Sequence, residues 1–202
     1  MEKIPKKNLT EETYDKAAEG YAKKFENIGV RSKDVDQAFE YISKENPNVL
    51  EIGCGGGREA AYILSKTDNY IGIDVSAGML AQAQENLPDA QFQKTAVETY
   101  DFPTNVDIVF AFASLLHTSK EDLKDVFERM YEALNESGVV YLSLKRKDKY
   151  STTVVEDSYG PREFFYYSRD DIHEVAGEGF EEVFYEEQAR EEDWFTMILR
   201  KK

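Results

Sequence analysis

Three glycines, Gly53, Gly55 and Gly57, stand at alternate positions directly after an apolar run that contains the acid Glu51. Glycine lets a backbone approach a ligand closely and adopt dihedral angles closed to other residues. A second acid, Asp74, ends the next apolar run, "YIGID". In an open α/β sheet, ligands bind beyond the carboxyl ends of the strands. The pattern therefore predicts a ligand site formed by the glycine loop and the Asp74 carboxylate.

The glycine loop by itself is compatible with more than one ligand. A phosphate-binding NTPase loop requires a lysine followed by serine or threonine, and none follows here. A dinucleotide fingerprint has the pattern G-x-G-x-x-G at the end of the strand. If it starts at Gly53, Arg58 stands in place of the third glycine; if it starts at Gly55, Ala60 stands there and the pattern begins two residues too late. The third candidate is S-adenosylmethionine (SAM), which has no pyrophosphate. For SAM the loop need only admit the methionine part and the ribose.

Several motifs follow one another in a familiar order. "VLEIGCGGG" is similar to the glycine-rich motif of class I SAM-dependent methyltransferases, "YIGIDVSAGML" to their second motif, and "NVDIVFAFASLLHTSKEDL" to their fourth-strand motif. "AVETYDFP" resembles the segment that receives the adenine. The resemblance implies SAM as the cofactor. It also implies the cofactor-binding residues, which are Tyr14, Tyr21, Glu51, Gly53, Gly55, Gly57, Asp74, Val75, Met79, Ala96, Val97, Glu98 and Ala111.

The same resemblance assigns roles to some of these residues. Asp74 would accept hydrogen bonds from both ribose hydroxyls, and Met79 would pack on the adenine. Val97 and Glu98 would flank the ring and bind its amino group. Glu51 would contact the cofactor directly or indirectly, with capping of backbone amides near the loop as the alternative.

Neighbouring residues with reactive side chains need a separate interpretation. We expect Cys54 to be a small buried filler rather than a nucleophile. Asp107 is expected to bind loop amides rather than to take part in catalysis. Arg58 could pair with Glu59 or Asp74, or reach the SAM carboxylate, and the sequence does not choose among them.

Methyl transfer from a sulfonium is an in-line displacement with a neutral leaving group, so orientation contributes most of the catalysis. A base is needed only where the acceptor is protonated at working pH. His117, after the fourth strand, is the candidate base, with helix capping or packing at the rim as the alternative. His173 lies among charges and is expected at the surface. With two histidines and one cysteine the chain has no zinc-ligand cluster, so no metal is expected.

Two segments are expected to form the acceptor pocket. In "YDKAAEGYAKKF", Tyr14 and Tyr21 lie seven residues apart and share a helix face, where they either close over SAM or anchor the core. The aromatic-rich segment 146–167 shows no clear period. Alternation along "REFFYYS" places Phe165 and Tyr167 on one face, and with Tyr150 they are the predicted substrate-pocket residues.

Strands and helices alternate along most of the chain. Strands are expected at 48–52, 69–73, 90–95, 106–112, 139–145, 180–188 and 193–201, and helices at 10–28, 32–45, 57–66, 76–87, 119–137 and 168–179. The last two strands are joined by the short turn "AREE", so they must pair antiparallel. The fold class is therefore α/β, a Rossmann-like seven-stranded, mostly parallel sheet with an antiparallel last strand and helices on both faces. One domain, 1–202, carries an N-terminal helical lid (1–46) and an acceptor-pocket insertion (146–167).

The charge of the chain limits its partners. Lys and Arg number 25 and Asp and Glu number 40, a net charge of −15, which repels nucleic acid and anionic lipid. The start, "MEKIPKKNLTEE", is unlike a signal peptide, so a cytoplasmic location is expected. We therefore expect a SAM-dependent methyltransferase acting on a small-molecule acceptor. The alternatives are a non-catalytic SAM-binding sensor or partner subunit, and a nicotinamide-dependent oxidoreductase.

Overall fold

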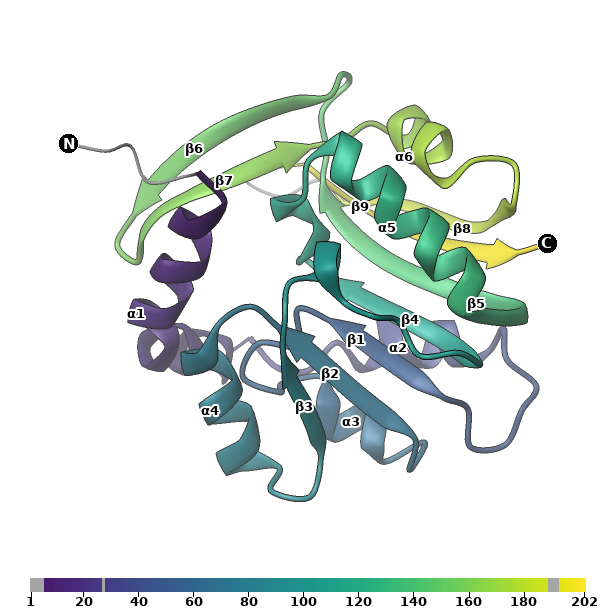
Figure 1. Cartoon of the computed structure of the whole chain (residues 1–202), viewed down its shortest axis with the longest axis horizontal. Helices are drawn as coiled ribbons and strands as arrows, with labels where there is room; N and C mark the ends of the chain where they lie inside the picture. The colour runs from purple at the N-terminus through teal and green to yellow at the C-terminus, as the bar shows by residue number, and fades with distance from the viewer. Residues whose placement is uncertain (1–5, 27, 189–192) are drawn as a thin grey trace.

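A seven-stranded sheet with the strand order β3-β2-β1-β4-β5-β9-β8 forms the centre of the molecule (Figure 1). The computed structural model describes residues 6–26, 28–188 and 193–202. The strands of this sheet are β1 (Val49–Ile52), β2 (Tyr70–Asp74), β3 (Gln91–Lys94), β4 (Val106–Phe112), β5 (Leu134–Lys145), β8 (Phe180–Gln188) and β9 (Trp194–Lys201). Only β9 runs antiparallel to its neighbours. The predicted fold class is confirmed, while the turn at 189–192 lies outside the described residues.

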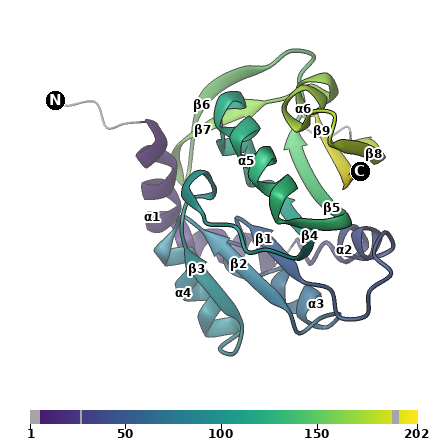
Figure 2. The ribbon, with the colours of Figure 1, turned by 45° about the vertical axis from the view of Figure 1, so that its right-hand side comes forward.

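Helices cover both faces of the sheet. The helix α2 (Ser32–Phe39) and the short α3 (Ala60–Leu64) pack on one face, and α5 (Lys120–Ala133) and α6 (Arg169–Ala176) pack on the other. The remaining helices, α1 (Lys6–Glu26) and α4 (Ala77–Asn86), lie beside the β3 edge (Figures 1 and 2). Two 3₁₀ turns, η1 (Val97–Thr99) and η2 (Leu115–His117), follow β3 and β4.

The strand β4 shows why the core has two halves. Every one of its residues is buried, as expected of a parallel strand covered on both faces. Phe110 and Phe112 face α2, where Phe110 packs with Val35. Val109 faces the opposite side, toward α5, where Phe127 is buried. Burial of both faces fixes the register, because a slip of one residue would exchange the two sets of side chains.

A separate hairpin, formed by β6 (Ser151–Asp157) and β7 (Gly160–Tyr166), was not predicted. Its turn is closed by the Asp157 carboxylate, which accepts from the Tyr159 backbone N–H at 2.9 Å, and by Gly160 at φ +117°. The signal for it lies in the sequence, where "DSYG" separates two runs rich in β-branched and aromatic residues.

The helix α1 connects this hairpin to α4, and Figures 1 and 2 both show α1 between them. The Asp15 carboxylate accepts from the Ser76 hydroxyl at 2.7 Å, at the start of α4. The Thr13 hydroxyl donates to the Pro161 carbonyl at 2.6 Å, at the start of β7. Thr10, where the first helix was predicted to begin, lies inside α1. It belongs to the same contact with the hairpin, because the backbone N–H of residue 163 donates to its hydroxyl at 3.2 Å.

Three predicted helices were too long. The last turn assigned to α5 belongs to β5 instead, since Leu134 pairs with Val106 of β4. The helix α3 begins only at Ala60, because Gly57, at φ +79°, has a backbone conformation that no α-helix contains. The helix α2 ends at Phe39, after which the chain continues in tighter turns. By contrast, the predicted start of α4 at residue 76 agrees with the structure, where the Ser76 hydroxyl caps the helix by accepting from the N–H of residue 79.

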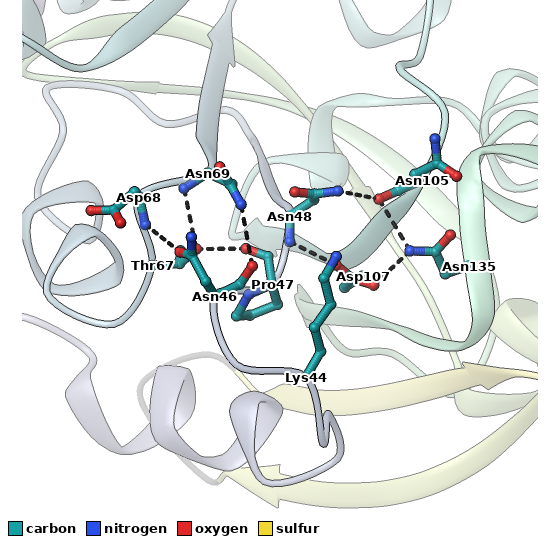
Figure 3. A network of polar contacts seen from close by, with 10 residues as sticks. All are labelled: Lys44, Asn46, Pro47, Asn48, Thr67, Asp68, Asn69, Asn105, Asp107 and Asn135. Atoms are coloured by element: carbon teal, nitrogen blue, oxygen red, sulfur yellow. Dashed lines mark hydrogen bonds and ion pairs between the residues drawn. The ribbon is translucent and has the colours of Figure 1, made fainter.

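Asp107 holds together the loops at the amino ends of the strands (Figure 3). Its carboxylate accepts from the backbone N–H of Asn48 at 2.7 Å, from the Lys44 ammonium at 2.6 Å and from the Asn135 amide at 2.6 Å. Asp107 is the second residue of β4, whose other end leads to η2. The predicted structural role for Asp107 is confirmed.

Spanning a membrane requires about twenty consecutive, predominantly apolar helical residues. No helix within residues 6–26, 28–188 and 193–202 has that length and apolar character.

Candidate cofactor and acceptor site

A cavity of about 1180 Å³ lies where β1, β2, β4 and β5 end, under α1 and the hairpin. Most of the predicted site residues line it, namely Tyr14, Tyr21, Gly53, Gly55, Gly57, Asp74, Val75, Met79, Ala96, Val97, Glu98 and His117. These residues come from segments far apart in the sequence. The strand order brings them together, because it places all these loops at one edge of the sheet.

Gly53 is required by the packing of two loops. Its φ is +72°, and a Cβ at this position would lie 2.3 Å from the Cβ of Ser114. The Ser114 hydroxyl donates to the Ile52 carbonyl at 2.6 Å, so the segment after β4 is held against the glycine loop. Any side chain at residue 53 would push these two segments of the cavity wall apart.

Asp74 ends β2 with its carboxylate at the cavity. Its Oδ2 accepts from the Gly55 N–H and its Oδ1 from the Ser76 N–H, each at 2.9 Å. Burial raises the pKa of Asp74, while these backbone N–H groups oppose the shift. Each carboxylate oxygen can accept a further hydrogen bond. This donor set fits a pair of vicinal hydroxyls, as a ribose presents.

Glu51 lies beneath the glycine loop and outside the cavity lining. It is 1% exposed, and it accepts a hydrogen bond from the Tyr70 hydroxyl at 2.6 Å. Burial, and then the charge of Glu59, raises the pKa of Glu51 to about 8. The structure therefore contradicts a direct contact between Glu51 and a ligand in the cavity. Ala111 is likewise fully buried in β4, and the cavity wall is formed by Phe112 and the residues after it.

Two residues of the glycine segment with reactive side chains, Arg58 and Cys54, have distinct environments. Arg58 donates through Nε to the Glu59 carboxylate at 2.6 Å, which selects one of its three possible partners. Cys54 is buried, and burial raises the pKa of its thiol well above the usual value. This environment agrees with Cys54 as a buried filler, because a thiolate is the reactive form.

His117 bonds to two groups that fix its tautomer. Its Nδ1 lies 2.6 Å from the Glu163 carbonyl, which can only accept, so Nδ1 carries the proton. Its Nε2 lies 2.9 Å from the Tyr14 hydroxyl and accepts from it. Burial, together with the nearby cations of Arg162 and Lys145, lowers the pKa of His117 to about 4. The predicted position of His117 at the cavity is correct, but its ring is neutral and its basic nitrogen is already engaged.

Comparisons with known proteins agree with this geometry. A family model described as a methyltransferase domain matches residues 49–138. A trans-aconitate 2-methyltransferase of Afipia carboxidovorans is 35% identical over 132 residues, which are 64% of this chain and 50% of that protein. The chain spans about half the length of the curated relatives it matches.

Solved structures show the same fold. A SAM-dependent methyltransferase of Methanosarcina mazei superposes with a TM-score of 0.68 at 17% identity, over 80% of this chain and 95% of that one. The 1,6-didemethyltoxoflavin-N1-methyltransferase of Burkholderia thailandensis, with S-adenosylhomocysteine bound, gives 0.67 at 18% identity, over 84% and 77%. Residues 49–138 thus match a methyltransferase domain, and the chain shares the fold of SAM-dependent methyltransferases.

The matched domain and the shared fold favour SAM over a nicotinamide as the cofactor. Met79, Val97 and Glu98 lie on the Asp74 side of the cavity, where the motif resemblance places the adenine. Within the described part of the chain, no three His, Cys, Asp or Glu side chains gather as metal ligands would.

The predicted substrate-pocket residues, Tyr150, Phe165 and Tyr167, do not line the cavity. Tyr150 stacks on Phe165 with ring centroids 6.1 Å apart and lies against the tilted ring of Tyr167 at 5.4 Å, away from the cavity. The alternation along β7 was predicted correctly, but the opposite face, with Arg162 and Phe164, lines the cavity. A period of two does not say which face of a strand a cavity lies on.

Sequence reasoning missed three basic residues that line the cavity, Arg31, Lys145 and Arg162. Lys145 ends β5 and Arg162 lies on β7. The motifs describe the cofactor side, whereas Lys145 and Arg162 come from the variable acceptor side. The only signal was that Lys145 ends an apolar strand, at the edge where sites form.

Proposed function

We propose that this chain transfers a methyl group from SAM to a small-molecule acceptor. The observation that carries the proposal is a single cavity that joins Asp74 at its cofactor end to His117 and Phe164 at its other end. The relatives support it, since they are named for small acceptors, trans-aconitate and 1,6-didemethyltoxoflavin. The net charge of −15 favours acceptors other than nucleic acid and membrane lipid.

The cofactor residues act by binding and orienting. Asp74 would accept from the ribose hydroxyls, while Met79 and Val97 would enclose the adenine and Glu98 would bind its amino group. Bound SAM supplies a sulfonium methyl, whose bond to sulfur breaks as an acceptor lone pair bonds to its carbon, leaving neutral S-adenosylhomocysteine. Correct alignment of such reactants can contribute roughly 7–11 kcal/mol to catalysis. The chain contributes chiefly by holding the two ligands in line.

The helix α1 and the hairpin would together form the lid of the cavity. Tyr14 and Tyr21 line the cavity from α1, and their rings meet edge to face with centroids 5.2 Å apart. Thr10 and Thr13 bind the hairpin through their hydroxyls. A lid anchored at both sides excludes water, which strengthens the electrostatic interactions inside.

His117 acts in this proposal as a positioning residue. A general base works best with a pKa near the operating pH, and a pKa of about 4 leaves His117 a weak base at neutral pH. Its Nε2 instead holds the Tyr14 hydroxyl at the cavity wall. An acceptor that is already ionised, or that carries a free lone pair, requires no base.

The proposal is tested by incubating the purified chain with SAM labelled in its methyl group and a panel of small metabolites. Labelled product together with S-adenosylhomocysteine is expected for at least one member. If the chain binds SAM but yields no product from any member, the non-catalytic sensor or partner subunit is the better interpretation.

A further inference from the structure

Two side chains of opposite charge, Arg31 and Asp34, line the cavity from the start of α2. Both are half-buried. Within residues 6–26, 28–188 and 193–202, no carboxylate lies within ion-pair distance of the Arg31 guanidinium, and no cation lies within that distance of the Asp34 carboxylate. The two charges therefore remain available to a ligand that fills the cavity.

The guanidinium of Arg31 is held at the point where β4 ends. Its Nη1 donates to the Ser143 hydroxyl at 2.8 Å, and the same oxygen accepts from the backbone N–H of Ala113 at 3.1 Å. Its Cζ lies 5.8 Å from the centroid of the Phe112 ring, within the range of a cation–π contact. A guanidinium carries several N–H donors, and the bond to Ser143 occupies one of them. Arg31 can therefore bind an anion without giving up this anchor.

The carboxylate of Asp34 lies against the same strand as Arg31. Burial, and then the charge of Asp34, raises the pKa of the Tyr141 hydroxyl, which places Asp34 near that tyrosine of β5. Tyr141 and Ser143 are two residues apart in β5, so their side chains point to the same face of the sheet. Asp34 and Arg31 thus face neighbouring positions of one strand, and they present a negative and a positive group in one part of the cavity wall.

This pair of charges lies across the glycine loop from the proposed ribose site. Asp74 ends β2, and the strand order continues with β1 and then β4, which ends at Phe112 beside Arg31. Neighbouring strands are about 4.8 Å apart, so the ends of β2 and β4 are separated by roughly 10 Å. The methionine part of SAM is a short flexible chain that leaves the ribose and ends in an ammonium and a carboxylate. A chain that starts at Asp74 and crosses the glycine loop therefore ends near the start of α2.

Resting on the proposed function, we infer that Arg31 binds the carboxylate of the methionine part of SAM and that Asp34 binds its ammonium. The amino-acid end of SAM carries both charges, so it matches a cation and an anion in one wall, whereas a simple anion would match Arg31 alone. Arg58, the alternative partner for that carboxylate, already donates to the Glu59 carboxylate at 2.6 Å. Charge-assisted bonds at the far end of the methionine chain hold it in place and so orient the sulfonium between the ribose site and α2.

The test is isothermal titration of the full chain with S-adenosylhomocysteine and three analogues of it. One analogue lacks only the carboxylate, one lacks only the amino group, and 5′-methylthioadenosine lacks the whole amino-acid group. Arg31→Met should weaken S-adenosylhomocysteine about tenfold or more and the decarboxylated analogue less than about twofold. Asp34→Asn should weaken S-adenosylhomocysteine about tenfold or more and the deaminated analogue less than about twofold. The affinity for 5′-methylthioadenosine should be the same in both variants and the unmodified chain, which also shows that the variants are folded.

Lys33→Met is the matched control, because it removes a positive charge between Arg31 and Asp34 from an exposed lysine outside the cavity lining. It should leave all four affinities unchanged. Should a variant fail to fold, the unmodified chain decides, since it must bind S-adenosylhomocysteine about tenfold or more tightly than the decarboxylated or the deaminated analogue.

The inference is wrong, and the proposed function stands, if either variant leaves the affinity for S-adenosylhomocysteine unchanged. The same holds if either variant weakens the analogue that lacks its partner group as much as it weakens S-adenosylhomocysteine, or if the unmodified chain binds all four compounds equally. If the unmodified chain binds neither SAM nor S-adenosylhomocysteine, the proposed function fails and the inference fails with it.

Discussion

The neutral His117 should make the stability of the fold depend on pH in a defined window. In the folded chain burial and two nearby cations lower its pKa to about 4, against 6.5 for an unperturbed histidine. The unfolded chain therefore binds a proton first as the pH falls. The contribution of His117 to stability is complete above pH 6.5 and is lost progressively between pH 6.5 and pH 4.

The two pKa values set the size of this effect. Between pH 7.5 and pH 4.5 the linkage amounts to about 2.5 kcal/mol, a large fraction of the stability of a single domain. In His117→Asn the amide can still donate to the Glu163 carbonyl, but it cannot take up a proton. This variant should be less stable at pH 7.5 and should lose about 2.5 kcal/mol less than the unmodified chain on acidification.

Urea unfolding at pH 7.5, 6.5, 5.5 and 4.5, followed by circular dichroism, measures the difference. His173→Asn is the matched control, because His173 is the other histidine of the chain and lies exposed on α6. This variant should keep the loss of stability between pH 6.5 and pH 4 that His117→Asn lacks. Parallel profiles for the unmodified chain and His117→Asn would refute the buried, neutral imidazole.

Three further predictions concern the cofactor side of the cavity. Asp74→Asn should weaken S-adenosylhomocysteine by about 1–3 kcal/mol in isothermal titration, with the exposed Asp89→Asn unchanged; equal affinities would remove Asp74 from the ribose site. Glu51→Gln should stabilise the fold increasingly from pH 4.5 to pH 8, because a carboxyl with a raised pKa in the folded chain costs stability as the pH rises. Thermal unfolding across that range measures the effect. A difference in stability between variant and unmodified chain that stays constant with pH would mean that the carboxyl ionises normally. Replacing Thr10 and Thr13 by valine removes two hydrogen bonds between α1 and the hairpin, of about 1 kcal/mol each. Stopped-flow measurements should then show faster release of S-adenosylhomocysteine. An unchanged rate would mean that α1 does not gate the cavity.

Much of the fold follows from local patterns in the sequence. Alternation of buried strands and capped helices predicted the seven strands of the sheet, and the short acidic turn required the last two to be antiparallel. Errors fell where a tertiary contact overrides a local signal. Gly138 suggested the end of a long helix, but Leu134 pairs with Val106 and draws the chain into β5 four residues earlier. The β6–β7 hairpin was missed because its strands are half exposed and their turn was not recognised.

The site was predictable where a backbone conformation dictates the residue. The glycine loop was found on that basis and Asp74 from its place at the end of a strand, and both line the cavity. The acceptor side depends instead on which face of β7 turns inward, and the pattern of residues could not decide that. Glu51 was misjudged as a possible direct contact because an acid in a strand next to a site looks functional, whereas its partner is the Tyr70 hydroxyl.

The central claim is that the cavity between Asp74 and His117 binds SAM. Isothermal titration of the purified full chain with S-adenosylhomocysteine tests it most directly. One site per chain is expected, with SAM competing for the same site. Absence of binding heat, together with an unchanged melting temperature in the presence of either compound, would contradict the account.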